Sequence, residues 1–245
     1  IYRGPDGGFY LAMTDLHIYA QREGYRDTEW ERDGKAYGWG NNRGLVLMKS
    51  FDLIHWTRTN IRFDQMSKEF AQIGCAWAPE TVYDPATGRM MIYFTMRFGN
   101  EQNRLYYVYV NQDFNRIESI PQILFEYPSG ASAIDGDITP IWNEERQKME
   151  YHLFYVAHES GSGIKQAVSD RIDGSYRFDP RWIDFEPVAC EAPNVWKRIG
   201  EDKWVLMYDI FGINPHNFGF VETSDFVHFK NSVSYTHLRA HETEL

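Results

Sequence analysis

The stretch MMIYFTMR, residues 90–97, decides the fold. It is short and rich in aromatic, β-branched and methionine side chains, and it lacks helical periodicity, so it predicts a buried strand. Three further runs have the same character: FYLAMTD (9–15), YHLFYVAH (151–158) and KWVLMYDI (203–210). The chain is therefore expected to contain a central strand that recurs along its length.

Each central strand belongs to a longer repeated unit. Three are preceded by turn sequences, and most are followed by another strand-like segment with a polar end, such as MKSFDLIHW (48–56) and VETSDFVHF (221–229). The central strands begin at residues 9, 90, 151 and 203. Four-stranded units of roughly 40 to 50 residues with inserted loops are typical of β-propeller blades. We predict one all-β domain over residues 1–232, with a long loop at 21–43.

Composition excludes several classes of function. The net charge of −10 and the absence of a basic run argue against nucleic acid and against an anionic membrane surface as partners. No apolar run approaches the roughly 18 residues of a membrane span. Cys75 and Cys190 provide neither a disulfide framework nor a metal-ligand spacing. The chain has no calcium-loop or HExxH motif, so we predict no metal and no cofactor.

Three repeats begin with distinctive residues: CAWAPE (75–80), SAIDGDITP (132–140) and ACEAP (189–193). Trp77 lies 13 residues before Met90, Glu191 lies 13 residues before Trp204, and Asp135 lies 16 residues before Tyr151, each counted to the central strand of its repeat. In a propeller these starts converge at one end, so the three residues are expected around one pocket.

Two converging carboxylates suit cleavage of a glycosidic bond. One stays protonated as a general acid because burial or a neighbouring charge raises its pKa, and another activates water or attacks directly. From the residues alone, a solvated Glu191 at a strand end and a turn-forming Asp135 remain open alternatives.

In order and spacing, WAPE, IDGDI and CEAP together resemble glycoside hydrolase family 43, from Ile1 to about Ser232. The resemblance implies a five-bladed β-propeller, of which about four blades are present. It also implies inverting hydrolysis of arabinose- or xylose-containing polysaccharides. Glu191 matches the general acid. Asp135 matches the carboxylate that tunes this acid and orients the sugar, with Asp137 as the alternative because the DGD spacing makes the alignment ambiguous.

The general base of this family is an Asp near the start of the first blade, and the resemblance places it just before Ile1. Asp6 lies in the GPDG hairpin turn and is a poor substitute. We therefore expect residues 1–245 alone to be inactive. The segment VSYTHLRAHET, 233–243, resembles a translated sequencing adaptor, so residues 233–245 are expected to be a non-native tail.

Four further residues are candidates for binding the substrate. Trp77 is expected either to stack on a sugar or to pack between blades, and Glu80 either to bond sugar hydroxyls or to face water. Asp15 ends a central strand, where it either lines the pocket or caps the strand. His216 matches a central His that contributes to the pore or to a bound cation in some family members, or it is a surface-loop residue.

Two alternative functions remain. A related retaining propeller glycosidase is disfavoured because its RDP motif and E-C-P acid are absent. A non-catalytic carbohydrate-binding propeller would carry the same carboxylates incidentally. The expected partner is an oligosaccharide or polysaccharide, and this substrate class implies a secreted or cell-envelope (periplasmic) protein.

Overall fold

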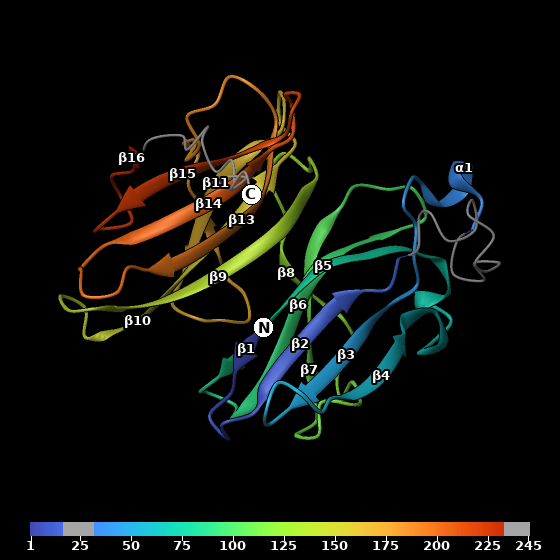
Figure 1. Ribbon diagram of the computed structural model, residues 1–245. Helices are drawn as coiled ribbons and strands as arrows, with labels where there is room; N and C mark the ends of the chain where they lie inside the picture. Colours follow the sequence, from blue (N-terminus) through green and yellow to red (C-terminus); the bar gives the residue numbers. More distant parts are fainter. Residues whose placement is uncertain (17–31, 233–245) are drawn as a thin grey trace, which may run out of the picture. The chain divides into compact units, whose positions relative to one another are not determined.

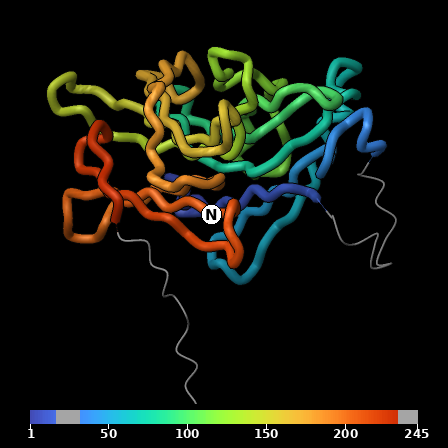
Figure 2. Tube along the Cα trace, turned by 90° about the horizontal axis from the view of Figure 1, so that it is seen from above, coloured from blue at the N-terminus to red at the C-terminus, as the bar shows by residue number. Residues whose placement is uncertain are grey.

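The computed structural model describes residues 1–16 and 32–232, which form four antiparallel four-stranded sheets (Figure 1). Within each sheet the strands lie side by side in chain order, so every sheet is a meander, and the Cα trace in Figure 2 follows these meanders. Propeller blades are built in this way. The all-β propeller class predicted from the sequence is confirmed, with four blades among the described residues.

The chain divides by its internal contacts into two compact units. Unit 1 comprises Ile1–Gly136 and Ile172–Ser175, and unit 2 comprises Asp137–Arg171 and Tyr176–Leu245. The residues 233–245, for which a non-native tail is expected, lie outside the described part of the chain, as do residues 17–31.

Unit 1 holds two sheets and the short helices between them. The first sheet contains β1 (Tyr2–Arg3), β2 (Phe9–Thr14), β3 (Gly44–Ser50) and β4 (Thr57–Arg62), and the second contains β5 (Ile73–Asp84), β6 (Arg89–Phe98), β7 (Arg104–Val110) and β8 (Gln122–Phe125). The helices are α1 (Gly34–Tyr37) and the 3₁₀ turns Phe63–Gln65 and Phe70–Gln72. The loop expected at 21–43 is thus partly helical. Its residues before 32 lie outside the described part.

The core of unit 1 joins its two sheets through large apolar side chains. Leu45 and Leu47 of β3 and Ile92 and Phe94 of β6 are fully buried in one cluster. Phe63 stacks on Phe94 with 4.9 Å between the ring centroids. Burying such side chains is the main favourable contribution to the stability of the unit.

Unit 2 holds most of the remaining two sheets. The third sheet contains β9 (Ala133–Asn143), β10 (Lys148–Ala157), β11 (Gly163–Ser169) and β12 (Arg177–Phe178), and the fourth contains β13 (Cys190–Lys197), β14 (Trp204–Ile210), β15 (Asn217–Thr223) and β16 (Lys230–Asn231). Residues 133–136 of β9 belong to unit 1 and residues 137–143 to unit 2. Phe154 of β10 contacts both Phe226 and Phe229, which lie in the turn between β15 and β16, so aromatic packing joins the third sheet to this turn of the fourth.

The four predicted central strands coincide with β2, β6, β10 and β14. Each is the second strand of its sheet and pairs with a neighbour on both sides. In β6 and β10 most side chains are buried, because both faces of these strands are covered. A strand buried on both faces is a continuous apolar run rather than an alternating one, which explains why these segments were recognisable.

The polar end of the repeat forms the same turn in the first and fourth sheets. In SFDLIHW (50–56) the Asp52 carboxylate accepts hydrogen bonds from two backbone N–H groups and lies 2.8 Å from Nδ1 of His55. The segment TSDFVHF (223–229) repeats each of these contacts around Asp225. An Asx turn of this kind reverses the chain locally, so the sequence repeat reflects a structural one.

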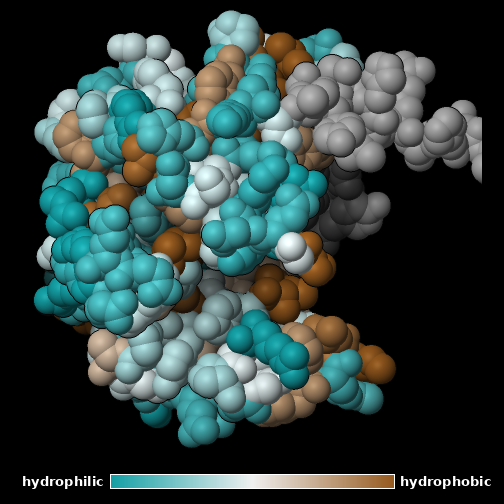
Figure 3. Space-filling model, turned by 90° about the vertical axis from the view of Figure 1, so that its left-hand side faces the viewer, coloured by the Kyte–Doolittle hydropathy of each residue, from teal (hydrophilic) through white to brown (hydrophobic). Residues whose placement is uncertain are grey.

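The face that Figure 3 shows is mostly hydrophilic, with hydrophobic residues exposed in small groups. Across residues 1–16 and 32–232, none of the helices has both the length and the apolar character needed to cross a bilayer.

Candidate functional site

Each of the strands β5 and β13 contains a β-bulge at the motif expected to carry the chemistry. In β5, Trp77 pairs with Thr95, and the next pair, Glu80 with Tyr93, leaves one extra residue on β5. Ala78, inside the bulge, has a φ of 42°. A bulge bends the strand and redirects its side chains, and bulges often lie next to functional sites.

The bulge of β13 repeats this geometry in unit 2. Glu191 pairs with Asp209 and Asn194 with Met207, again with one extra residue, and Ala192 has a φ of 52°. The sequence alignment of Trp77 with Glu191 is therefore matched by the pairing register of the two strands.

Asp135 of β9 occupies a different position from the one expected. Its φ is 53°, and its N–H donates to Oγ1 of Thr95 at 3.0 Å. The N–H of Ala78 donates in the same way to Oγ1 of Thr14 at 3.0 Å. Asp135 thus corresponds to Ala78 and lies one residue after the position of Trp77. The number of residues between Asp135 and its central strand could not reveal this correspondence, because that number includes a hairpin turn of variable length.

Glu191 has the environment expected of a proton donor. Its side chain is half-buried, and burial together with the nearby Asp209 carboxylate raises its pKa, while His216 lowers it to a smaller extent. Since desolvation and a like charge both disfavour ionisation, the carboxyl group holds its proton to higher pH than an ordinary glutamate. Unit 2 thus brings Glu191, Asp209 and the exposed His216 within electrostatic reach of one another.

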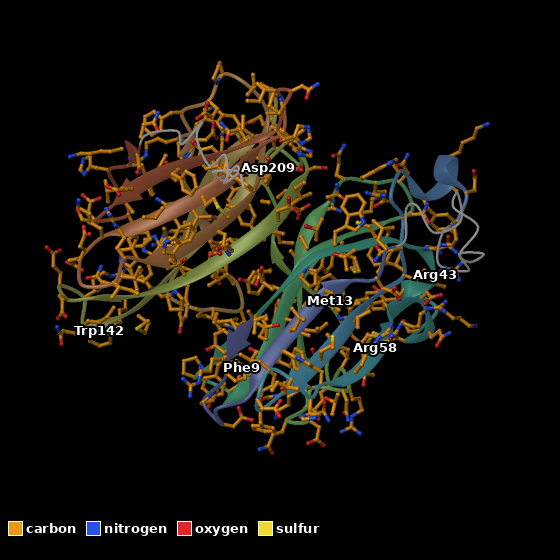
Figure 4. All side chains as sticks on the ribbon, viewed as in Figure 1. Phe9, Met13, Arg43, Arg58, Trp142 and Asp209 are labelled. Atoms are coloured by element: carbon orange, nitrogen blue, oxygen red, sulfur yellow. The ribbon has the colours of Figure 1, made fainter. Side chains whose placement is uncertain are left out.

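Asp209 was not singled out from the sequence, although a signal was present. It lies near the end of the apolar run KWVLMYDI, where a carboxylate among apolar neighbours needs a reason. Figure 4 labels it near one end of unit 2, away from Trp142 at the other end of the unit's strands. In the structure it is half-buried and pairs directly with Glu191, whose pKa its negative charge helps to raise.

A pocket of about 500 Å³ adjoins the start of β13 in unit 2. Its walls are the segments 160–163 and 184–189 together with Trp182. The segment 160–163 is fixed to the strand by two hydrogen bonds: the N–H of Cys190 donates to the Ser162 carbonyl at 3.0 Å, and Oγ of Ser162 donates to the Cys190 carbonyl at 3.1 Å. The pocket therefore lies directly before Glu191 along the chain.

Asp137, the alternative to Asp135, has a structural environment. It is buried, and its carboxylate accepts hydrogen bonds from the Val195 N–H at 3.1 Å, from Nδ2 of Asn194 at 3.3 Å and from Oγ1 of Thr139 at 3.2 Å. These bonds tie β9 to β13 inside unit 2. A carboxylate engaged in this way positions the bulge of β13 rather than a substrate.

Trp77 in unit 1 is held by its surroundings. Its indole N–H donates to the Gly40 carbonyl at 2.8 Å, and the guanidinium carbon of Arg97 lies 4.5 Å from its ring centroid. Arg97 and Asp135 both influence the buried Cys75 thiol, whose pKa burial raises to about 12. Unit 1 thus brings Trp77, Arg97 and Asp135 to the same end of the second sheet.

The other candidates of unit 1 have separate environments. Glu80 keeps contact with solvent, yet surrounding protein raises its pKa by desolvation. Asp15 is buried, and its carboxylate accepts a hydrogen bond from Nδ2 of Asn60 at 3.4 Å. Burial acts to raise the pKa of Asp6, but bonds from Tyr10 and Lys49 outweigh it and lower the pKa to about 2, as suits a structural turn residue.

Within the described ranges, no group of three or more histidine, cysteine, aspartate or glutamate side chains is arranged to hold a metal ion. The two cysteines are buried free thiols.

Solved structures with a similar fold include three family 43 or related enzymes. They are a family 43 β-1,3-galactosidase (TM-score 0.62, 13% identity, 96% of this chain and 44% of that one), the exo-β-1,3-galactanase of Clostridium thermocellum (TM-score 0.61, 13% identity, 96% and 47%) and the arabinanase of Bacillus subtilis (TM-score 0.61, 17% identity, 93% and 72%). At these identities the likeness concerns the fold alone. The chain spans less than half the length of the first two.

Sequence comparisons give the family. No curated protein sequence matches the chain. A family described as a probable glycosyl hydrolase domain, in the group related to glycoside hydrolase family 43, matches residues 1–243. The match covers nearly the whole chain, and the chain therefore belongs to the family of glycosyl hydrolase domains related to glycoside hydrolase family 43.

Proposed function

We propose that this chain is the propeller part of an inverting glycosidase in which Glu191 is the general acid. The observation that carries the proposal is the state of this carboxyl group. It is half-buried beside Asp209, and its pKa is raised. In the chain it comes shortly after the segment 184–189, which lines a pocket of about 500 Å³. General acids of glycosidases need a raised pKa so that they are protonated when the substrate binds.

In the proposed reaction Glu191 donates its proton to the oxygen of the leaving sugar while water attacks the anomeric carbon from the opposite face. Asp135 orients the sugar and tunes the acid, as the family resemblance implies. The base that activates the water is the Asp expected ahead of Ile1. Turnover of an aryl arabinofuranoside by residues 1–245 alone would contradict this placement of the base.

The proposed substrate is a terminal arabinofuranosyl or xylosyl residue of a plant cell-wall polysaccharide. The family resemblance supports this choice, and an arabinanase is among the structures with a similar fold. A β-1,3-linked galactosyl residue is the second candidate, because a β-1,3-galactosidase and an exo-β-1,3-galactanase share the fold over 96% of this chain. Polymeric substrates of this size are met outside the cytoplasm, so we propose secretion or a place in the cell envelope.

The test compares Glu191→Gln with the surface control Glu201→Gln in the full-length product of the gene. The substrates are aryl α-L-arabinofuranosides, β-D-xylosides and β-D-galactosides and the corresponding oligosaccharides. We expect Glu191→Gln to lower kcat on oligosaccharides about 10²- to 10⁴-fold, the usual contribution of a general acid. Substrates with a 2,4-dinitrophenol leaving group should be affected far less, since that group departs without a proton.

Proton NMR of the first product distinguishes inversion from retention. Equal activity of Glu191→Gln and wild type on oligosaccharides would refute the role of Glu191. Sugar binding without turnover in every assay would instead favour the carbohydrate-binding alternative.

A further inference from the structure

Trp39 is an exposed indole on a tightly fixed loop of unit 1. Its side chain is 74% exposed, the highest value among the exposed tryptophans of the described residues. An indole in water forgoes the favourable burial of a large apolar area. A flexible loop could fold such a side chain against the protein. The indole stays available to a ligand only if the loop is fixed by its contacts.

The loop that carries Trp39 is pinned by a buried cation. Arg97 is 5% exposed, and its guanidinium donates to the carbonyl of Tyr37 at 2.9 Å and to that of Trp39 at 2.9 Å. Gly38 between them has a φ of 80°, and a Cβ there would lie 2.7 Å from Nη2 of Arg97. Only glycine permits both this backbone conformation and the close approach of the guanidinium.

Side-chain amides fix the remainder of the loop. Nδ2 of Asn41 donates to the Gly38 carbonyl at 3.0 Å. Asn42 is fully buried and bonds both the N–H and the carbonyl of Ala76, at 2.6 and 2.8 Å. The backbone of the loop is therefore docked on β5 directly before Trp77, while Trp39 itself stays exposed.

The same contacts connect Trp39 to Asp135. The ring centroids of Trp39 and Trp77 lie 6.2 Å apart in an edge-on arrangement, and Trp77 pairs with Thr95 in the sheet. Thr95 accepts the hydrogen bond from the N–H of Asp135. Thr95 and Arg97 are two residues apart on β6, a separation of roughly 7 Å along a strand. The exposed indole therefore lies at the end of unit 1 that carries Asp135.

We propose that Trp39 is a stacking platform for a second sugar ring, one ring beyond the one that Asp135 orients. The inference rests on the proposed function, which supplies the ligand class. Aromatic faces beside precisely placed polar groups are common in small-molecule sites, and a platform that is fixed before binding avoids the entropic cost of ordering it. In this arrangement Trp77 positions Trp39 rather than binding sugar itself. Its indole N–H is already bound to the Gly40 carbonyl, and its ring packs against that of Trp39.

The experiment measures sugar binding by calorimetry in the Glu191→Gln background, where cleavage does not interfere. The probes are arabinotriose, xylotriose and β-1,3-galactotriose and their monosaccharides. Trp39→Ala should raise Kd for the preferred trisaccharide about tenfold and leave Kd for its monosaccharide unchanged. Trp39→Phe should retain most of the affinity, and the control Trp196→Ala, a change at a tryptophan 39% exposed in unit 2, should have no effect.

An unchanged trisaccharide Kd in Trp39→Ala, or an equal loss for trisaccharide and monosaccharide, would overturn the platform while leaving the proposed function intact. If the Glu191→Gln parent bound none of the sugars, the platform and the proposed function would both fail.

Discussion

The bulges of β5 and β13 have the same backbone and opposite chemistry. Each places a proline after an alanine with positive φ, in WAPE (77–80) and EAPN (191–194). In β5 the first residue of the motif is Trp77, whose indole N–H is hydrogen-bonded to the protein. In β13 it is Glu191, a half-buried carboxyl group beside a second carboxylate. The repeat thus fixes the backbone position at the start of the bulge, and the side chain at that position determines its chemistry.

The largest expected effect comes from the shared backbone itself. Replacing Ala192 or Ala78 with valine puts a β-branched side chain at a φ of 52° or 42°. Such residues strain this region, so each change should lower the free energy of unfolding by about 1–3 kcal/mol. Glycine at either position should be tolerated, because it has no Cβ to strain.

Chemical denaturation of the four variants measures both effects. Similar losses for Ala78→Val and Ala192→Val would establish that the two bulges are equivalent in energy as well as in geometry. A loss at one position only would break the comparison.

The next effect concerns the hydrogen bonds that anchor these positions. Thr95→Val removes the acceptor of the Asp135 N–H, and Thr14→Val removes that of the Ala78 N–H, each bond being 3.0 Å long. A lost bond that leaves a partly buried N–H unpaired costs about 1 kcal/mol or somewhat more. Both variants should be destabilised to a similar extent in thermal unfolding, but Thr95→Val alone should raise KM, because only Asp135 is expected to orient the sugar.

Equal KM values for Thr95→Val and Thr14→Val would show that the backbone of Asp135 does not need this anchor. Thr57→Val is a matched control, since Thr57 lies at the start of β4 and its hydroxyl donates to the Lys49 carbonyl at 3.2 Å.

A smaller effect is expected in the pH dependence of catalysis. Burial and then the Asp209 carboxylate raise the pKa of Glu191. Asp209→Asn removes the second cause, so the pKa of Glu191 should fall and the alkaline limb of kcat/KM should move to lower pH. His216→Gln removes a group that lowers this pKa and should move the limb in the opposite direction. Shifts in the same direction for both variants would contradict the arrangement.

The smallest expected effect is on how the stability of the folded protein depends on pH. Because the pKa of Glu191 is raised in the folded state, the folded protein holds this proton more tightly than the unfolded chain does. Below a pH of 4.5, the ordinary value for glutamate, both states are protonated and ionisation contributes nothing. As pH rises from there through the raised pKa, the wild type loses stability that Glu191→Gln keeps. The Tm difference between Glu191→Gln and wild type should therefore grow above this pH and then level off, and a constant difference would contradict burial of the carboxyl group.

The parts of the fold that the sequence predicted are those whose pattern is local. The run at 90–97 was recognisable because an interior strand is apolar on both faces, and the turns at 50–56 and 223–229 were recognisable because their hydrogen bonds lie within a few residues. The position of Asp135 was one residue off because the spacing along the chain includes a hairpin turn of variable length, whereas its correspondence with Ala78 rests on hydrogen bonds to a neighbouring sheet.

The site residues that were missed depend on distant partners. Asp209 resembled the end of an ordinary strand until its pairing with Glu191 was known. Trp39 lies in a polar segment expected to be a plain loop, and its fixation depends on Arg97, which is 58 residues away in the chain. Charge and exposure at such positions follow from tertiary contacts, which no local pattern encodes.

The meander of each sheet has a consequence for how the protein is made. Every strand pairs with its neighbour in the sequence, so the second sheet is complete once the ribosome has released Ile73–Phe125. Pairing between nearby segments requires little loop closure and favours rapid folding. The sheets can therefore assemble one after another during synthesis.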